Sequence, residues 1–235
     1  MSYQIKTETL EQDIAKVQQA FLTKVYSWMS IALLVTAGFS YFTLTNEVLL
    51  ELILSTRWGI WVLLLAEIGL VVYLTARIET MKAETSILLF LLYSTLNGIT
   101  LAPIFLIYTG ESVMNTFIIC SGMFGAMSLY GYVTKKNLDG VGSYLGMGLV
   151  GIIIASIINM FIASEALNMT IAFVGIIIFT GLTAYNTQKM KAMSYVMMED
   201  GSVAQKGAIM GALVLYLNFI NLFLMLLRIM GDRRR

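Results

Sequence analysis

Long uncharged stretches of apolar residues recur along the chain, separated by short segments that carry most of the charges. A helix needs about 20 mostly apolar residues to cross the hydrocarbon core of a bilayer. The pattern therefore predicts seven membrane-spanning helices, and only the second contains a charged residue, Glu67. The predicted spans cover residues 25–46, 58–76, 85–110, 112–134, 141–164, 166–188 and 207–227.

The segment before the first span is polar but has its own apolar periodicity. Leu10, Ile14, Val17 and Phe21 recur at helical spacing, with charged residues between them. This indicates an amphipathic helix on the cytoplasmic membrane surface, and the alternative is a solvated leader that frays. We therefore expect a leader over 1–24, a membrane domain over 25–230 and a basic tail over 231–235.

Composition supports an integral membrane protein, because 58% of the 235 residues are hydrophobic, only 12% are charged and the mean hydropathy is +0.82. The net charge of +1 argues against a nucleic-acid partner. With no histidine and one cysteine, no disulfide can form within the chain and no His/Cys metal site is possible. We expect no cofactor and no enzyme activity, since the sequence has neither a Ser–His pair, a zinc motif nor a membrane-embedded aspartate pair.

The distribution of lysine and arginine predicts the orientation. If the N-terminus is cytoplasmic, the inner segments carry ten basic residues and the outer loops carry only Arg57. Cytoplasmic loops are enriched in basic residues, so we expect the N-terminus inside. Seven spans would place the arginines of the tail outside. Either the tail tolerates this, or one segment is re-entrant.

Pro103 lies inside the third predicted span. Proline removes a backbone hydrogen bond, so the helix should kink or break near Thr100. Thr95, Asn97 and Thr100 are expected to satisfy the backbone groups that the proline frees.

Glu67 lies at the midpoint of the second span, where a charge costs about 2.5–3.5 kcal/mol. It must be protonated, paired or hydrated. Either it lines an ion or proton path, or it joins two helices through a salt bridge. Arg228 or an amide of the last span is the expected partner. Arg77 lies ten residues after Glu67, about 15 Å along a helix, and is expected to anchor the cytoplasmic rim.

Amide side chains mark the last two spans. Asn218 and Asn221 lie near the middle of the seventh, in LYLNFINLFLMLLR. Asn186 lies near the end of the sixth, in TAYNTQK, with Tyr185 and Gln188 as supporting polar residues. Polar groups at this depth should face protein or water, so the last helix is expected inside a bundle. The amides of Asn186 and Asn218 form part of a cytoplasmic gate, or each joins helices by hydrogen bonding.

These two segments, together with AEIGLVV and ARIE of the second span, resemble the transmembrane Bax inhibitor motif, or Bax inhibitor-1-like, family. The short loops resemble those of its bacterial members. The resemblance implies an all-α bundle of seven transmembrane helices with the last helix central, surrounded by two groups of three, in the bacterial inner membrane. Similar members are pH-sensitive calcium leak channels, and others restrain a membrane protease or suppress cell death.

The resemblance also assigns roles to positions. The two aspartates of the family's gate correspond to Asn186 and Asn218, and the arginine that joins them when they ionise corresponds to Arg77. Glu67 and Arg228 correspond to an intramembrane ion pair. Because both aspartates are asparagines here, the site cannot titrate. We expect a chain that resembles the proton-bridged, closed form at every pH and leaks calcium poorly.

The expected partners are the lipid bilayer and calcium as the permeant ion, and we expect a monomer. The alternative function is a regulatory protein that binds a membrane protease or another membrane complex. Such a protein would act through the leader or through residues 188–206, and it needs no pore.

Overall fold

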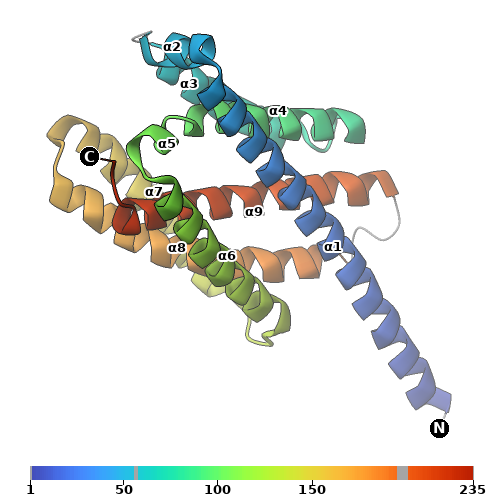
Figure 1. The fold of residues 1–235 in the computed structure, drawn as a ribbon. Helices are drawn as coiled ribbons and strands as arrows, with labels where there is room; N and C mark the ends of the chain where they lie inside the picture. Colours follow the sequence, from blue (N-terminus) through green and yellow to red (C-terminus); the bar gives the residue numbers. More distant parts are fainter. Residues whose placement is uncertain (1, 56–57, 195–200, 235) are drawn as a thin grey trace. The chain divides into compact units, whose positions relative to one another are not determined.

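The computed structural model describes residues 2–55, 58–194 and 201–234. These residues form helices and one isolated β-bridge, between Tyr108 and Arg233. The helices are α1 (Ser2–Thr45), α2 (Glu47–Ser55), α3 (Gly59–Arg77), α4 (Ala83–Leu101), α5 (Ile104–Ile107), α6 (Gly110–Val133), α7 (Asp139–Ile162), α8 (Glu165–Met193) and α9 (Gly201–Met230) (Figure 1).

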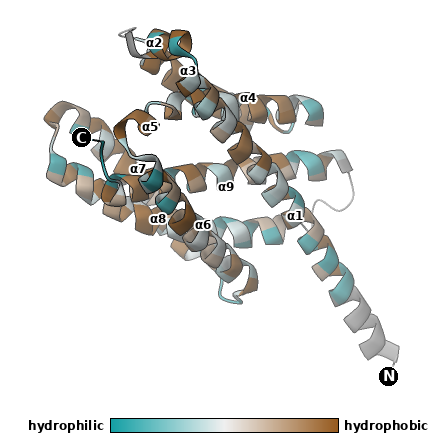
Figure 2. Ribbon diagram, in the orientation of Figure 1, coloured by the Kyte–Doolittle hydropathy of each residue, from teal (hydrophilic) through white to brown (hydrophobic). Residues whose placement is uncertain are grey.

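The seven predicted spans are confirmed. Seven helical segments are long and apolar enough to cross a membrane, and each overlaps one predicted span. They cover Gln12–Thr45, Gly59–Arg77, Ala83–Ile107, Gly110–Val133, Asp139–Ile162, Glu165–Met193 and Ser202–Met230. Hydrophobic residues occupy most of these helices, while hydrophilic residues gather toward helix ends (Figure 2). Large apolar side chains such as Leu34 and Phe161 are exposed, as a lipid-facing surface requires.

The leader is the first part of α1 rather than a separate helix. Residues 12–24 contain no glycine or proline and are mostly good helix formers, so nothing in the sequence ends the helix before the first span. Where side chains are described, the apolar stripe is at least partly buried: Ile14 and Val17 are half-buried and Phe21 is buried. The side chain of Leu10 lies outside the described residues. The stripe packs against protein, and the position of the leader relative to the membrane stays a prediction.

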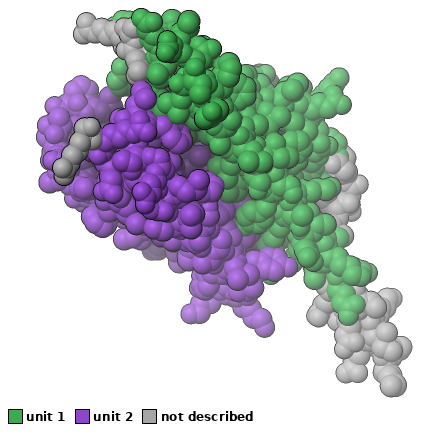
Figure 3. Space-filling model, in the orientation of Figure 1, with its two compact units in different colours: residues 1–103, 190–213 green, residues 104–189, 214–235 purple. Residues whose placement is uncertain are grey.

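The chain divides into two compact units (Figure 3). Unit 1 comprises residues 1–103 and 190–213, and unit 2 comprises residues 104–189 and 214–235. Unit 1 therefore holds α1 to α4, and unit 2 holds α5 to α7 and α8 up to Lys189, while α9 contributes to both units. In the seventh span 72% of the membrane-length window is buried, against at most 39% in any other span. This burial is what a central helix requires, but its placement between the two groups stays a prediction.

In unit 1, α4 packs against both α1 and α3. The hydroxyl of Thr36 on α1 donates to the backbone oxygen of Ser94 on α4 at 2.9 Å, and that of Ser40 donates to the oxygen of Gly98 at 2.7 Å. Small residues let helix backbones approach each other closely, and their hydroxyls then bond across the interface.

The break at Pro103 is confirmed. Helix α4 ends at Leu101, and the short helix α5 begins immediately after the proline. The expected role of the nearby hydroxyls is wrong, however. Thr95 donates to the oxygen of Leu91 in its own helix, and Thr100 donates to Glu67.

The C-terminal tail is bound to the start of α6 within unit 2. The amide of Thr109 donates to the oxygen of Asp232 at 3.1 Å, and the amide of Asp232 donates to the hydroxyl of Ser112 at 2.9 Å. The basic loop around Lys136 lies at the opposite end of α6. The tail and this loop are therefore on opposite sides of a membrane that α6 spans, which agrees with full crossings by α7, α8 and α9. The orientation itself stays a prediction.

A matched pair of glycines on α6 tests its packing against α8. A Cβ at Gly131 would overlap the backbone of Ala184, whereas a Cβ at Gly125 would meet open space. We expect Gly131→Ala to lower the free energy of unfolding by about 1–3 kcal/mol. Gly125→Ala should be neutral or slightly stabilising, because alanine favours helix over glycine by about 1 kcal/mol. Thermal unfolding in detergent checks this, and equal melting temperatures for the two variants would contradict the close approach of α6 and α8.

Candidate functional site

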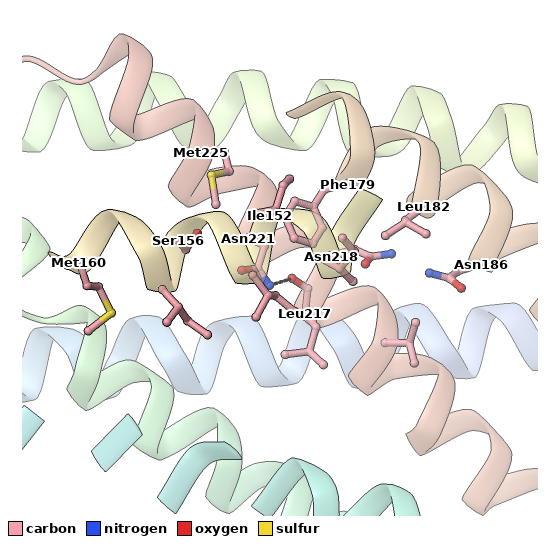
Figure 4. A pocket seen from close by; sticks show the side chains of 14 residues that line it. Ile152, Ser156, Met160, Phe179, Leu182, Asn186, Leu217, Asn218, Asn221 and Met225 are labelled. Carbon is pink, nitrogen blue, oxygen red and sulfur yellow. Dashed lines mark hydrogen bonds between the residues drawn. The ribbon is translucent and has the colours of Figure 1, made fainter. Parts of the chain in front are cut away.

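A cavity of about 570 Å³ lies among α7, α8 and α9 of unit 2 (Figure 4). Ten of its fourteen lining residues are apolar. The polar ones are Ser156 on α7, Asn186 on α8, and Asn218 and Asn221 on α9. A mostly apolar cavity with a few polar groups is the usual form of a site that binds or passes a small solute.

Helical periodicity explains why these residues share the cavity. On α9 the lining residues are 214, 217, 218, 221 and 225, and on α8 they are 179, 182 and 186. Residues three and four apart lie on one face of a helix. Each helix therefore turns one stripe toward the cavity, and the asparagines fall within those stripes.

The structure brings Asn186 and Asn218 to the same cavity, as the sequence predicts for neighbouring helices. Their amide groups point toward one another near Leu182 (Figure 4). The two asparagines reach the same level partly because both helices are longer than predicted. Helix α9 begins at Gly201, before the predicted start at 207, and α8 continues to Met193, beyond the predicted end at 188.

Asn218 is the most deeply buried of these amides. Its side chain is only 5% exposed, and its Nδ2 has no hydrogen-bond partner among the described residues. An unpaired buried donor costs about 1–3 kcal/mol. Asn221 differs, because its Nδ2 donates to the oxygen of Leu217 on the same helix at 2.7 Å. Asn218 therefore presents a free donor at the cavity.

Tyr185 and Gln188 do not line the cavity, and their role as supporting polar residues of the gate stays a prediction. Gln188 holds the loop before α7: its Oε1 accepts from the amide of Leu138 at 2.9 Å, and its Nε2 donates to the oxygen of Lys136 at 2.8 Å. The ring of Tyr185 lies where a Cβ on Gly142 would be. Through these contacts both residues link α8 to the start of α7 and the loop before it.

Glu67 is buried in unit 1, with 7% of its surface exposed. It accepts a hydrogen bond from Asn97 Nδ2 at 3.2 Å and one from the hydroxyl of Thr100 at 2.5 Å. Both partners lie on α4, three residues apart, and so on one face of that helix. Sequence reasoning looked for a charged partner or an amide of the last helix and missed these residues. The sequence signal that could have identified them is that Asn97 and Thr100 lie three residues apart in an otherwise apolar span.

The other two predicted charged residues lie apart from this cluster. Arg228 donates from Nη1 to Oδ1 of Asn168 in unit 2 at 2.8 Å. Arg77 is the last residue of α3 in unit 1 and is exposed. Glu67 and Arg228 belong to different units, as do Arg77 and the two asparagines. The Glu67–Arg228 ion pair and the approach of Arg77 to the asparagines therefore stay predictions.

Comparison of the sequence with known proteins shows which family and which proteins it is similar to. The profile of the family described as "Inhibitor of apoptosis-promoting Bax1" matches residues 18–235. "Inner membrane protein YbhL" of Escherichia coli (strain K12) is 46% identical over 217 residues, which cover 92% of this chain and 93% of that protein. An uncharacterized protein of Borreliella burgdorferi is 44% identical over 96% of this chain and 97% of its own length. One from Rickettsia prowazekii is 42% identical over 97% of this chain and 94% of its own length.

A pair of threonines on α4 tests the environment of Glu67. We expect Thr100→Val to destabilise the fold by about 1–3 kcal/mol, because it removes a buried hydrogen bond to a carboxyl group. Thr95→Val removes a hydroxyl that bonds only within its own helix turn, and its effect should stay within about 0.5 kcal/mol. Thermal unfolding should also show that Thr100→Val has little further effect once Glu67 is replaced by leucine. A full additive loss there would show that the two side chains are not coupled.

Proposed function

This chain belongs to the Bax inhibitor-1-like family, and we propose that it is a calcium leak channel-like protein whose gate is a pair of uncharged amides. The gate comprises Asn186 and Asn218. The observation that supports this assignment is that both side chains, from two different helices, line a single cavity at membrane depth. In this proposal the protein resides in the inner membrane as a monomer, with its N-terminus in the cytoplasm, and it has neither a cofactor nor an enzyme activity.

The chemistry of the amide pair sets the expected behaviour. Two neighbouring carboxyl groups have coupled titrations, because the first to ionise opposes ionisation of the second. Such a pair shares a proton at low pH and repels itself when both groups are charged. Amides have the same shape but keep both donor and acceptor groups at every pH. The gate of this chain therefore resembles the protonated state permanently.

The amide pair also disfavours calcium. Calcium binds oxygen ligands and is held most strongly by carboxylates. Here the cavity has no charged lining residue, and Asn218 Nδ2 presents an N–H donor to it. A cation at this point would meet a partial positive charge and no compensating anion. The leak should therefore be weak as well as independent of pH.

Restoring two carboxyl groups tests the proposal. In liposomes, the Asn186→Asp, Asn218→Asp double variant should admit calcium faster as the pH rises from about 5 to 8, because the paired acids then lose their shared proton. The wild-type chain should show a small flux that does not change across this range. The measurement is calcium entry reported by a trapped fluorescent indicator.

Asn221→Asp is the matched control, since it places one carboxyl group in the same cavity without forming the pair. It should not reproduce the pH response of the double variant. A steep pH dependence of the wild-type flux, or a double variant that stays silent at every pH, would reject the amide gate.

Arg77 provides an independent test of the role implied by the family. We propose that it approaches the gate only when the gate is anionic. Arg77→Gln should then leave the wild-type flux unchanged. In the double-aspartate variant it should move the pH midpoint of the flux upward, since a nearby cation favours ionised carboxylates. An unchanged midpoint would confine Arg77 to the rim of the membrane.

A further inference from the structure

A second cavity of about 500 Å³ in unit 2 differs in character from the first. It lies where α7 ends, α8 begins and α9 ends. Its polar lining includes Asn159, Glu165, Asn168, Arg228 and Arg233. Because these positions are the ends of membrane-spanning segments, the cavity is at the depth of lipid headgroups.

The charges in this cavity favour an anion. The lining includes two arginines and one carboxylate, that of Glu165, and therefore carries a net positive charge. Arg228 is half-buried, and its guanidinium is oriented by the hydrogen bond from Nη1 to Asn168. A guanidinium has five N–H donors, so one such bond leaves others to direct at a phosphate. A fixed arginine with a second one nearby is a common arrangement for binding phosphate.

The charged cavity adjoins the apolar one. Ser156 and Met160 line both, so the two meet at these side chains. Along α7 the apolar cavity extends from Met160 to Leu149, eleven residues and about 16 Å. This is close to the depth of one leaflet, half of the roughly 30 Å hydrocarbon core.

The apolar cavity is also open toward lipid. Ile153, Ile157 and Met160 line it and are 51%, 52% and 57% exposed. A groove with half-exposed apolar walls gives an acyl chain sideways access from the bilayer. Met160, an unbranched and flexible side chain, lines both cavities and lies at one end of the apolar cavity in Figure 4.

We propose that the two cavities together form a binding site for one anionic phospholipid. Arg228 and Arg233 bind the phosphate, and an acyl chain runs past Met160 along α7 toward Asn218. The acyl chain covers the open side of the groove. A free phosphate would leave the apolar half unused, and the net positive lining favours a headgroup with a net negative charge. The proposal does not rest on ion conduction, since it concerns the binding of lipid alone.

Native mass spectrometry of the full chain tests the site, after exchange into micelles that contain phosphatidylglycerol and phosphatidylcholine. The headgroup variant is Arg228→Gln with Arg233→Gln. Its matched control is Arg234→Gln, a neighbouring exposed arginine of the tail that does not line the cavity. The acyl-chain variant is Ile157→Trp, which fills the groove. Its control is Ile158→Trp, 47% exposed and outside both linings.

The wild-type chain should retain one phosphatidylglycerol in preference to phosphatidylcholine. The headgroup variant should lower the apparent affinity for phosphatidylglycerol at least about tenfold. The Ile157→Trp variant should lower it while leaving the arginines intact, and both controls should behave as the wild type. Ile157→Trp keeps the test decisive if the arginine variant does not fold.

Three results would overturn the proposal. The first is equal retention of the two lipids by the wild type. The second is an equal loss of phosphatidylglycerol in the variants and their controls. The third is displacement of the bound lipid by millimolar inorganic phosphate or glycerol phosphate, which would identify a site for the free anion instead.

Discussion

At hydrocarbon depth there is no water to bond polar groups, so each must find a partner in the protein or face a cavity. This constraint separates the polar residues of the chain into two kinds. Glu67 is enclosed by Asn97 and Thr100, and Asn221 donates to its own helix. Asn218 is of the other kind: its Nδ2, like Ser128 Oγ and Thr180 Oγ1, is buried without a partner among the described residues, and of these three residues only Asn218 lines the cavity. The candidate site therefore includes one of the positions where the constraint is not met.

The same reasoning links fold to function. One stripe each of α7, α8 and α9 surrounds the cavity, and this geometry depends on the spacing of lining residues rather than on their charge. Asparagine and aspartate have nearly the same shape, so exchanging one for the other should change titration and formal charge more than the fold. At the ends of the same helices the constraint is relaxed, because headgroups and water are present. The arginines of the second cavity are therefore compatible with lipid-facing apolar walls nearby.

Much of the fold follows from the sequence, because charges end apolar stretches and proline ends helices. The seven spans and the break at Pro103 are of this kind. The true start of α1 could not be predicted, since residues 12–24 favour helix whether or not they cross a membrane. The partners of Glu67 were missed because hydrogen bonding between neighbouring helices depends on their rotation. Periodicity identifies the stripes of the cavity, but the void itself arises from packing. The pairing of Asn186 with Asn218 follows from their places on two consecutive spans, and only the role of gate aspartates at these positions came from family resemblance.

The central claim is that Asn186 and Asn218 share one cavity, and thiol labelling tests it most directly. Cys120, the single cysteine, would first be replaced by serine, which preserves a donor toward the oxygen of Phe219. Cysteines are then placed at 186 and 218, singly and together, and a bulky maleimide is counted by intact mass. If the side chains share the cavity, each single variant takes one label, and the double variant also takes only one, because the first excludes the second. Two labels on the double variant would contradict the account.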